Sequence, residues 1–177
     1  MRWVLGIAGL LVLVVLIVCA IGYMLPKSHV ASVSARFAAS PDSIWTSLTD
    51  VPAFPKWRPG LVSVELLPDE NGQRGWREIG KHDAVTYRVV ESAPPRRLVT
   101  RIADQTLPYG GSWTYDLTPD GSGTRLTITE HGEVYNPIFR FVSRFFLGYT
   151  STMEGVLRAL GTRHGETVAL EPAGTTS

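Results

Sequence analysis

The fold is decided by residues 136–165, which read NPIFRFVSRFFLGYTSTMEGVLRALGTRHG. Asn136 is a candidate N-cap, and Pro137 suits the first helical position, where its missing N–H is not needed. Apolar side chains then recur at steps of three and four residues, at Ile138, Phe141, Phe145, Tyr149, Met153, Val156 and Leu160. This spacing predicts one long helix whose apolar stripe packs against a broad concave sheet. Three glycines lower its helix propensity and allow bending or close contact: Gly148, Gly155 and Gly161.

The chain before this helix has mainly the pattern of short strands. Residues 29–37 predict a first strand, because the apolar Ala31, Val33, Ala35 and Phe37 alternate with the more polar set Val30, Ser32, Ser34 and Arg36. Ser40 and Pro41 then mark the start of a short helix, and the prolines around Trp57 indicate a second helical turn. Six further strands are predicted, with short connections that favour antiparallel neighbours, at residues 61–67, 75–80, 84–91, 97–103, 111–117 and 124–132. Because strands and helices are segregated along the chain, we predict an α+β fold in which a curved antiparallel sheet wraps the C-terminal helix.

The N-terminal segment has the length and composition of a membrane-spanning helix. Residues 3–25 contain no charged side chain, and a helix of that length spans about 34 Å, enough for a bilayer core of roughly 30 Å. A cleavable signal peptide is the alternative, but its apolar region would be shorter, and the cleavage-like residues 33–35 come late. We therefore predict an uncleaved single-pass anchor over residues 1–27. Arg2 and the amino terminus balance Lys27 and Arg36, so the side of the membrane that carries the domain stays undetermined.

The remaining chain is long enough for one domain with a single core. We place this domain at residues 28–166, followed by a small polar stretch, 167–177, that we expect to be a disordered tail. The whole chain of 177 residues has a net charge of only +1, and without Arg2 and Lys27, which flank the apolar segment, the acidic residues outnumber the basic ones by one. No basic face is indicated, so nucleic acid is not expected as a partner. Composition does not indicate the oligomeric state.

Neither a metal nor a cofactor is expected from the sequence. Cys19, the only cysteine, lies in the apolar segment, so the domain can build neither a disulfide nor a thiolate metal site. The four histidines, His29, His82, His131 and His164, form no closely spaced ligand pair. The chain also has no phosphate-binding or dinucleotide-binding glycine motif and no nucleophile elbow, so no catalytic residue is assigned.

Five short motifs along the domain resemble those of one superfamily. They are Ser40–Trp45, Phe54–Trp57, Ala93–Leu98, Gly111–Tyr115 and Gly123–Glu130. In their order and spacing they resemble the START-like, or polyketide cyclase and Bet v 1-like (SRPBCC), superfamily with its helix-grip fold, over residues 29–165. The resemblance implies a space between sheet and helix that holds lipids, sterols, polyketides or other apolar ligands. It also implies that some relatives are cyclases or hydratases, and the N-terminal apolar segment is an addition to the basic domain.

Strand alternation and the helical stripe together suggest which side chains would line such a space. Trp113 and Tyr115 share one face of a predicted strand, and Tyr87 lies on a similar apolar face. A mainly apolar pocket with a few polar groups suits a hydrophobic small molecule. The alternative is a completely filled core made of the same residues. The expected ligand-binding set is Trp76, Tyr87, Trp113, Tyr115, Glu130, Phe141, Phe145, Tyr149 and Met153.

Charged residues in this set and on the helix have two possible roles each. Glu130 continues the apolar face of its strand, so it could act as an acid, a base or a hydrogen-bond partner of a ligand. Alternatively, it is a strand-end carboxylate in water or paired with an arginine. Arg140 and Arg144 lie one helical turn apart and could bind an anionic head group, although a solvated helix face also explains them.

Three functional hypotheses follow from these observations. The first is a membrane-anchored protein that binds a hydrophobic small molecule or lipid between sheet and helix. The second is an enzyme of the cyclase, aromatase or hydratase type, whose polar groups in the same space would come from Glu130, Tyr87, Tyr115, Glu78 or Arg101. The third is an interaction module with a filled core. Neither the ligand nor the reaction can be named from the sequence.

Overall fold

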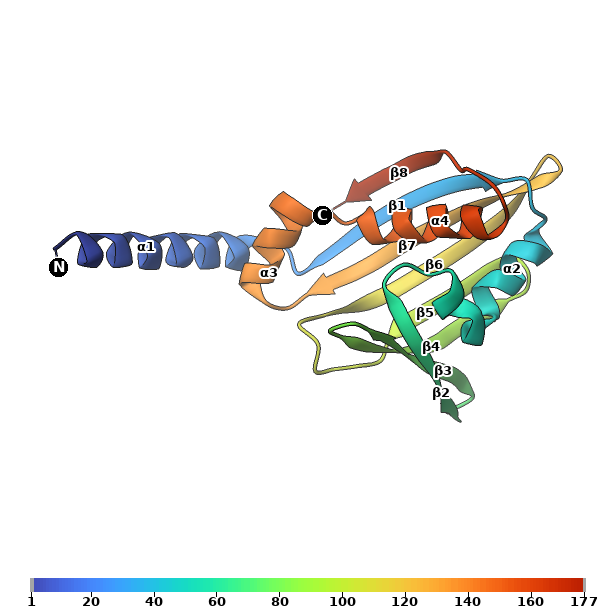
Figure 1. Ribbon diagram of the computed structural model, residues 1–177, viewed down its shortest axis with the longest axis horizontal. Helices are drawn as coiled ribbons and strands as arrows, with labels where there is room; N and C mark the ends of the chain where they lie inside the picture. The colour runs from blue at the N-terminus through green and yellow to red at the C-terminus, as the bar shows by residue number, and fades with distance from the viewer. Residues whose placement is uncertain (1, 177) are drawn as a thin grey trace.

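The structure is a computed structural model and describes residues 2–176. A long N-terminal helix leads into an eight-stranded sheet that curves around a shorter C-terminal helix (Figure 1). The elements in chain order are α1 (Arg2–Met24), β1 (Ser28–Phe37), α2 (Pro41–Thr49), η1 (Val51–Lys56), β2 (Leu61–Glu70), β3 (Gln73–Gly80), β4 (Ala84–Ala93), β5 (Arg97–Ile102), β6 (Tyr109–Asp120), β7 (Gly123–Val134), α3 (Pro137–Val142), η2 (Ser143–Leu147), α4 (Ser151–Arg163) and β8 (Leu170–Thr176). The predicted α+β helix-grip architecture is confirmed.

The sheet is antiparallel throughout, in the order β2-β3-β4-β5-β6-β7-β1-β8. Short turns connect most neighbours: Asn71 and Gly72, at φ 53° and 76°, join β2 to β3. Two consecutive residues with positive φ give a turn whose twist matches that of a hairpin. The pairing of β1 with β7, which are distant in the sequence, brings Ala31 opposite Glu130 and extends the concave face on which the site is built.

The hydrophobic core occupies the end of the sheet that lies away from α1. Ser40 caps α2, with its hydroxyl accepting from the N–H of Ser43, and so directs Ile44 and Leu48 into this core. α4 lies across the concave face of the sheet (Figure 1) and places Leu157 and Leu160 against the same cluster. Tight packing at this end holds α4 in place.

The predicted single helix over residues 136–165 is wrong, because the structure breaks it at Gly148. α3 runs into the π-helical turn η2, and α4 begins only at Ser151. Gly148 has φ 70° and ψ 177°, a backbone conformation that is essentially restricted to glycine. Asn136 does cap the first helix, accepting from the N–H groups of Ile138 and Phe139, as its position predicted.

The start of α3 packs against the end of α1 rather than against the sheet (Figure 1). A Cβ on Gly22 would collide with the carbonyl oxygen of Pro137, so this contact requires glycine in α1. Arg140 is buried, and its guanidinium donates to the carbonyl oxygens of Leu25 at 2.9 Å and Tyr135 at 3.1 Å. Both sequence interpretations of Arg140, head-group binding and a solvated face, are therefore wrong.

The stretch 167–177, expected to be a disordered tail, instead contains β8. Its backbone pairs antiparallel with β1, at the edge that β7 leaves free. Leu170 packs against the core, and Glu171 forms an ion pair with Arg125 of β7. A free strand edge offers unpaired N–H and C=O groups, and this pairing satisfies them.

Candidate ligand-binding cavity

A cavity of about 700 Å³ lies between the concave face of the sheet and the break in the C-terminal helix. Its walls come from β3 to β7, the start of β1, η2 and the first turns of α4. α4 begins at Ser151, so helix side chains fill only the far end of the concave face, where the core lies. The alternative offered by the sequence, a completely filled core, therefore does not describe the interior near α3.

Aromatic side chains form much of the cavity wall. Trp76 and Tyr87 face each other across β3 and β4 and are stacked, with ring centroids 5.7 Å apart and planes at 23°. Trp113 and Tyr115 are two residues apart on β6, so they lie on the same face of the sheet, with ring centroids 6.1 Å apart. On the helical side the wall includes Tyr149 and a stripe of α4 made of Thr152, Gly155 and Val156. Such a wall favours an apolar ligand.

A first polar cluster lies on the β3 side of this wall. Glu78 forms an ion pair with Arg58 and accepts a hydrogen bond from the indole Nε1 of Trp76 at 3.0 Å. The side chains of Arg58 and Glu78 are only 14% and 12% exposed, so each charge depends on the other. Burial, reinforced by Glu78, raises the pKa of Tyr87 well above its ordinary value. Burial likewise raises the pKa of Tyr115 to about 12, so both phenols keep their protons near neutral pH.

A second polar cluster lies where β1 and β7 meet α4. His29 is only 7% exposed, and its ring stacks on Tyr149 with centroids 3.7 Å apart and planes at 17°. Its Nε2 lies 3.4 Å from Glu130 Oε1 and has no hydrogen-bond partner within the described part of the chain. A Cβ on Gly132 would overlap the imidazole, so this glycine leaves the space that His29 occupies.

The structure brings together six of the nine residues predicted to bind a ligand. Trp76, Tyr87, Trp113, Tyr115, Glu130 and Tyr149 all line the cavity. Glu130 neighbours His29 there, not an arginine. Their proximity does not by itself show that they bind anything, so ligand binding at these positions stays a prediction.

The other three predicted residues lie elsewhere. Met153 is fully buried in the core cluster, because it shares a stripe of α4 with Leu157 and Leu160 rather than with Gly155. Phe141 and Phe145 belong to α3 and η2, which the break at Gly148 directs away from the sheet. Their rings pack on each other with centroids 4.9 Å apart, outside the cavity.

Sequence reasoning missed several polar residues of the cavity, among them His29 and Arg58 of the two polar clusters. His29 has the same strand parity as Ala31, which is fully buried, so alternation along β1 contained the signal for it. Arg58 follows the 3-10 helix η1 in an irregular turn, where no periodicity applies. Among the residues whose placement is described, no group of three or more His, Cys, Asp or Glu side chains could hold a metal ion.

Comparison with solved structures places this fold among START-like proteins. A START superfamily protein from Mycobacterium smegmatis is 20% identical and superposes with a TM-score of 0.61 over 76% of this chain and 96% of its own. Norcoclaurine synthase from Thalictrum flavum is 14% identical, with a TM-score of 0.62 over 78% of this chain and 87% of its own. The STAR-related lipid transfer protein (fragment 25–204) of Xanthomonas axonopodis is 21% identical, with a TM-score of 0.53 over 75% and 84%. At these identities the likeness shows the fold alone.

The fold is of the helix-grip type, with a cavity between its sheet and its C-terminal helical segment. A family model described as polyketide cyclase / dehydrase and lipid transport matches residues 28–165. The chain therefore belongs to this family. No curated protein sequence matches it significantly.

Proposed function

We propose that this protein binds a hydrophobic small molecule or lipid in the cavity and that α1 anchors it to a membrane. The observation that carries the proposal is the aromatic cavity of about 700 Å³, a volume within the usual range for small-molecule sites. The ligand would have an apolar body, because Trp76, Trp113 and Tyr149 supply flat apolar surfaces.

Two features of the wall favour a ligand that also carries polar oxygen groups. The protonated phenols of Tyr87 and Tyr115 can donate hydrogen bonds to a carbonyl or hydroxyl oxygen. At the other polar cluster, Glu130 can accept a hydrogen bond while the unpartnered Nε2 of His29 faces the same space. A hydroxyl group, which both donates and accepts, satisfies this pair.

The anchoring role rests on α1. Its residues Trp3–Met24 form a helix long and apolar enough to cross a membrane, and none of its most apolar stretch is buried against the domain. A signal sequence has the same appearance. The contacts that Gly22 and Leu25 make with α3 favour retention, because cleavage after Leu25 would remove one of the two carbonyl partners of the buried Arg140. The protein would then be a single-pass membrane protein, with the side of its domain unassigned.

Mass spectrometry of organic extracts from the purified full-length protein tests this function directly. A fluorescent fatty acid then measures uptake by wild type, by Gly155→Leu and by Arg158→Leu. Gly155 lines the cavity, and a Cβ added to it would meet no described atom within 4 Å, so leucine there should occupy ligand space. Arg158 is exposed on α4 and provides the matched control. An empty extract together with no uptake by wild type would exclude the proposal.

A second candidate function is acid–base catalysis on the same ligand. The observation that favours it is the proximity of His29 Nε2 to Glu130 Oε1, since such pairs move protons in many enzymes. Conversion would appear as a mass change, such as loss of water, when the extracted ligand is incubated with protein. His29→Asn and Glu130→Gln should then stop conversion while ligand binding persists. An unchanged ligand mass with wild-type protein would exclude catalysis.

A further inference from the structure

Exposed apolar side chains gather on α3 and η2. Phe146 is 75% exposed, Phe145 57% and Leu147 55%, and Ile138 on α3 is also exposed. We call these four residues the η2 apolar surface. Phe141 packs against both neighbouring phenylalanines, with centroid distances of 4.9 Å and 6.1 Å, and so holds them as one group. Contiguous exposed apolar residues of this kind mark an interaction surface.

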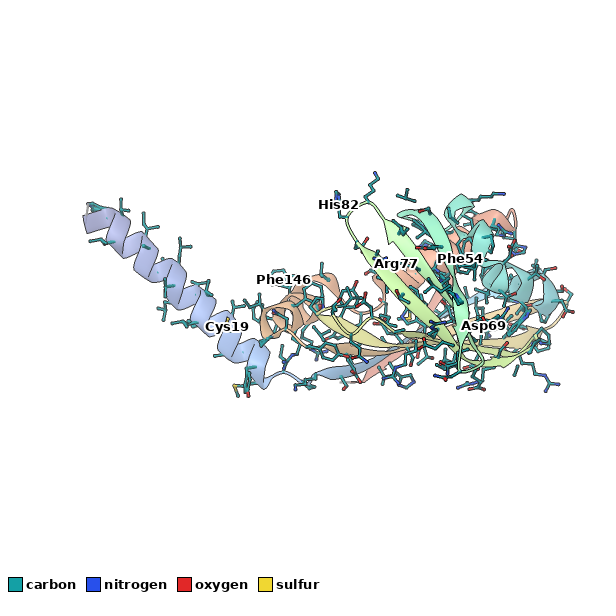
Figure 2. The ribbon with its side chains drawn as sticks, turned by 90° about the horizontal axis from the view of Figure 1, so that it is seen from below. Cys19, Phe54, Asp69, Arg77, His82 and Phe146 are labelled. Atoms are coloured by element: carbon teal, nitrogen blue, oxygen red, sulfur yellow. The ribbon has the colours of Figure 1, made fainter. Side chains whose placement is uncertain are left out.

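The η2 apolar surface lies beside the end of α1. Pro137, at the start of α3, contacts Gly22 in the last turn of α1, and Arg140 binds the Leu25 carbonyl just beyond it. Figure 2 shows Phe146 close to this junction and Asp69 in the part of the domain away from α1. One helical turn rises about 5 Å, so the start of α3 lies within roughly that distance of the level at which α1 ends.

We propose that the η2 apolar surface inserts into the lipid bilayer that α1 crosses, as a second membrane contact of the same domain. This inference rests on the proposed anchoring role of α1. A bilayer is the occupant that the position favours, because α3, which carries Ile138 and runs directly into η2, packs against the end of the apolar helix α1. Interfacial apolar faces typically bury about 5–10 Å into the boundary between head groups and acyl chains.

The charges around this surface suit lipid phosphates. Lys27, just after α1, and Arg144, in η2, are both exposed. Basic side chains beside an inserted apolar face add electrostatic attraction to anionic lipids. The residues at the junction, from Leu25 to Ser28, contain no acidic side chain.

A second membrane contact would also position the cavity. Leu147 belongs to the η2 apolar surface and also lines the cavity. Phe139 and Gly148, from the same helical segment, line the cavity too. An apolar ligand could therefore pass between a bilayer leaflet and the cavity along this segment, without crossing bulk water.

The test places a polarity-sensitive probe at position 146 of the full-length protein. Cys19→Ser removes the only native cysteine, and Phe146→Cys is labelled with the fluorophore NBD and reconstituted in phosphatidylcholine and phosphatidylglycerol vesicles. Asp69→Cys, near the end of β2, is the matched control. We expect blue-shifted emission and quenching by doxyl-labelled lipids at position 146 but not at 69. A label at 146 with the emission of water and no quenching would overturn the inference.

The outcome is separable from that of the proposed function. The NBD measurement needs no ligand, so insertion at 146 with an empty extract and no fatty-acid uptake would leave this inference standing and remove the binding function. Normal fatty-acid uptake with an unquenched probe at position 146 would leave the binding function standing and overturn the membrane insertion. The double variant Phe145→Ser with Phe146→Ser adds a second readout: transfer of a fluorescent fatty acid from vesicles should slow, while the amount bound at equilibrium stays unchanged. Unaltered transfer would contradict the route along η2.

Discussion

Replacing Gly148 with alanine tests the feature on which the cavity depends. At φ 70° and ψ 177°, an alanine would carry a strain of about 1–3 kcal/mol. No described atom lies within 4 Å of the added Cβ, so the penalty is conformational and not a clash. Alanine also restricts the unfolded chain, which offsets about 0.4–1 kcal/mol. We therefore expect Gly148→Ala to lower the stability of the domain by about 1–2 kcal/mol.

The matched control is Gly155→Ala, which changes the same atoms inside α4. Gly155 has helical neighbours and also has no described atom within 4 Å of its Cβ position. Alanine there should raise stability by about 0.5–1 kcal/mol, because glycine is the poorer helix former. The two substitutions therefore have opposite predicted signs.

Thermal unfolding of the full-length protein in detergent micelles measures both effects. Near-ultraviolet circular dichroism follows the aromatic residues of the domain, since α1 contributes only Trp3 and Tyr23. For a domain of this size 1 kcal/mol corresponds to about 3 °C in Tm, so Gly148→Ala should unfold about 3–6 °C lower and Gly155→Ala about 2–3 °C higher. A Gly148→Ala protein at least as stable as wild type would refute the reasoning. It would mean that position 148 is helical and that the C-terminal helix continues through it.

Three further predictions concern the cavity, the end of α4 and the α1 junction. Glu78→Gln leaves the Arg58 guanidinium buried without its partner and should lower stability by about 3 kcal/mol, measured as a fall in Tm of about 10 °C. Burial lowers the pKa of His164 below its ordinary 6.5, so the folded state favours the neutral imidazole. The stability that this contributes is present above pH 6.5 and is lost as the pH falls through the folded pKa. Tm should therefore fall between pH 7 and pH 5, and His164→Asn should flatten that fall. Gly22→Ala would collide with the Pro137 carbonyl and should increase protease cleavage between α1 and β1.

Each of these predictions has a control and a contradicting outcome. Glu70→Gln removes an ion pair whose carboxylate is 68% exposed, and Arg88 keeps its hydrogen bonds to the carbonyl oxygens of Pro68 and Gln73, so Tm should change little. A similar loss in both glutamine variants would argue against a special role for the buried carboxylate. An unchanged pH profile in His164→Asn would assign the acid sensitivity to other groups. Gly9 in α1 has open space around its Cβ position, and Gly9→Ala should leave cleavage unchanged. Equal cleavage of both alanine variants would contradict the α1–α3 contact.

The architecture could be predicted from local patterns because most of them agree with the final packing. Alternation along the strands and the segregated order of elements were enough for the antiparallel sheet and its C-terminal helix. The broken helix was not predictable in this way. Apolar residues keep their three-and-four spacing straight across Gly148, yet α3 packs on α1, a partner more than a hundred residues earlier in the chain.

Contacts between distant parts of the chain, which local patterns do not contain, also explain the other differences. β8 has a small, polar sequence without alternation, and it forms a strand because β1 has a free edge beside it. Six of the nine candidate site residues lie in the cavity, and five of them are on strands, where side-chain direction follows from parity. The three that lie elsewhere are all on the C-terminal helical segment. The break at Gly148 redirects Phe141 and Phe145, which precede it, whereas Met153 faces the core from another stripe of α4.

The junction between α1 and the domain has a consequence for how the protein moves. Only residues 25–27 separate α1 from β1, and the Gly22–Pro137 contact and the Arg140 hydrogen bond bridge this connection. With α1 in a bilayer, the domain would have no flexible tether and could not sweep a volume of solvent in search of partners. Its encounters would be confined to lateral diffusion, with one fixed side of the domain presented to neighbours in the membrane plane.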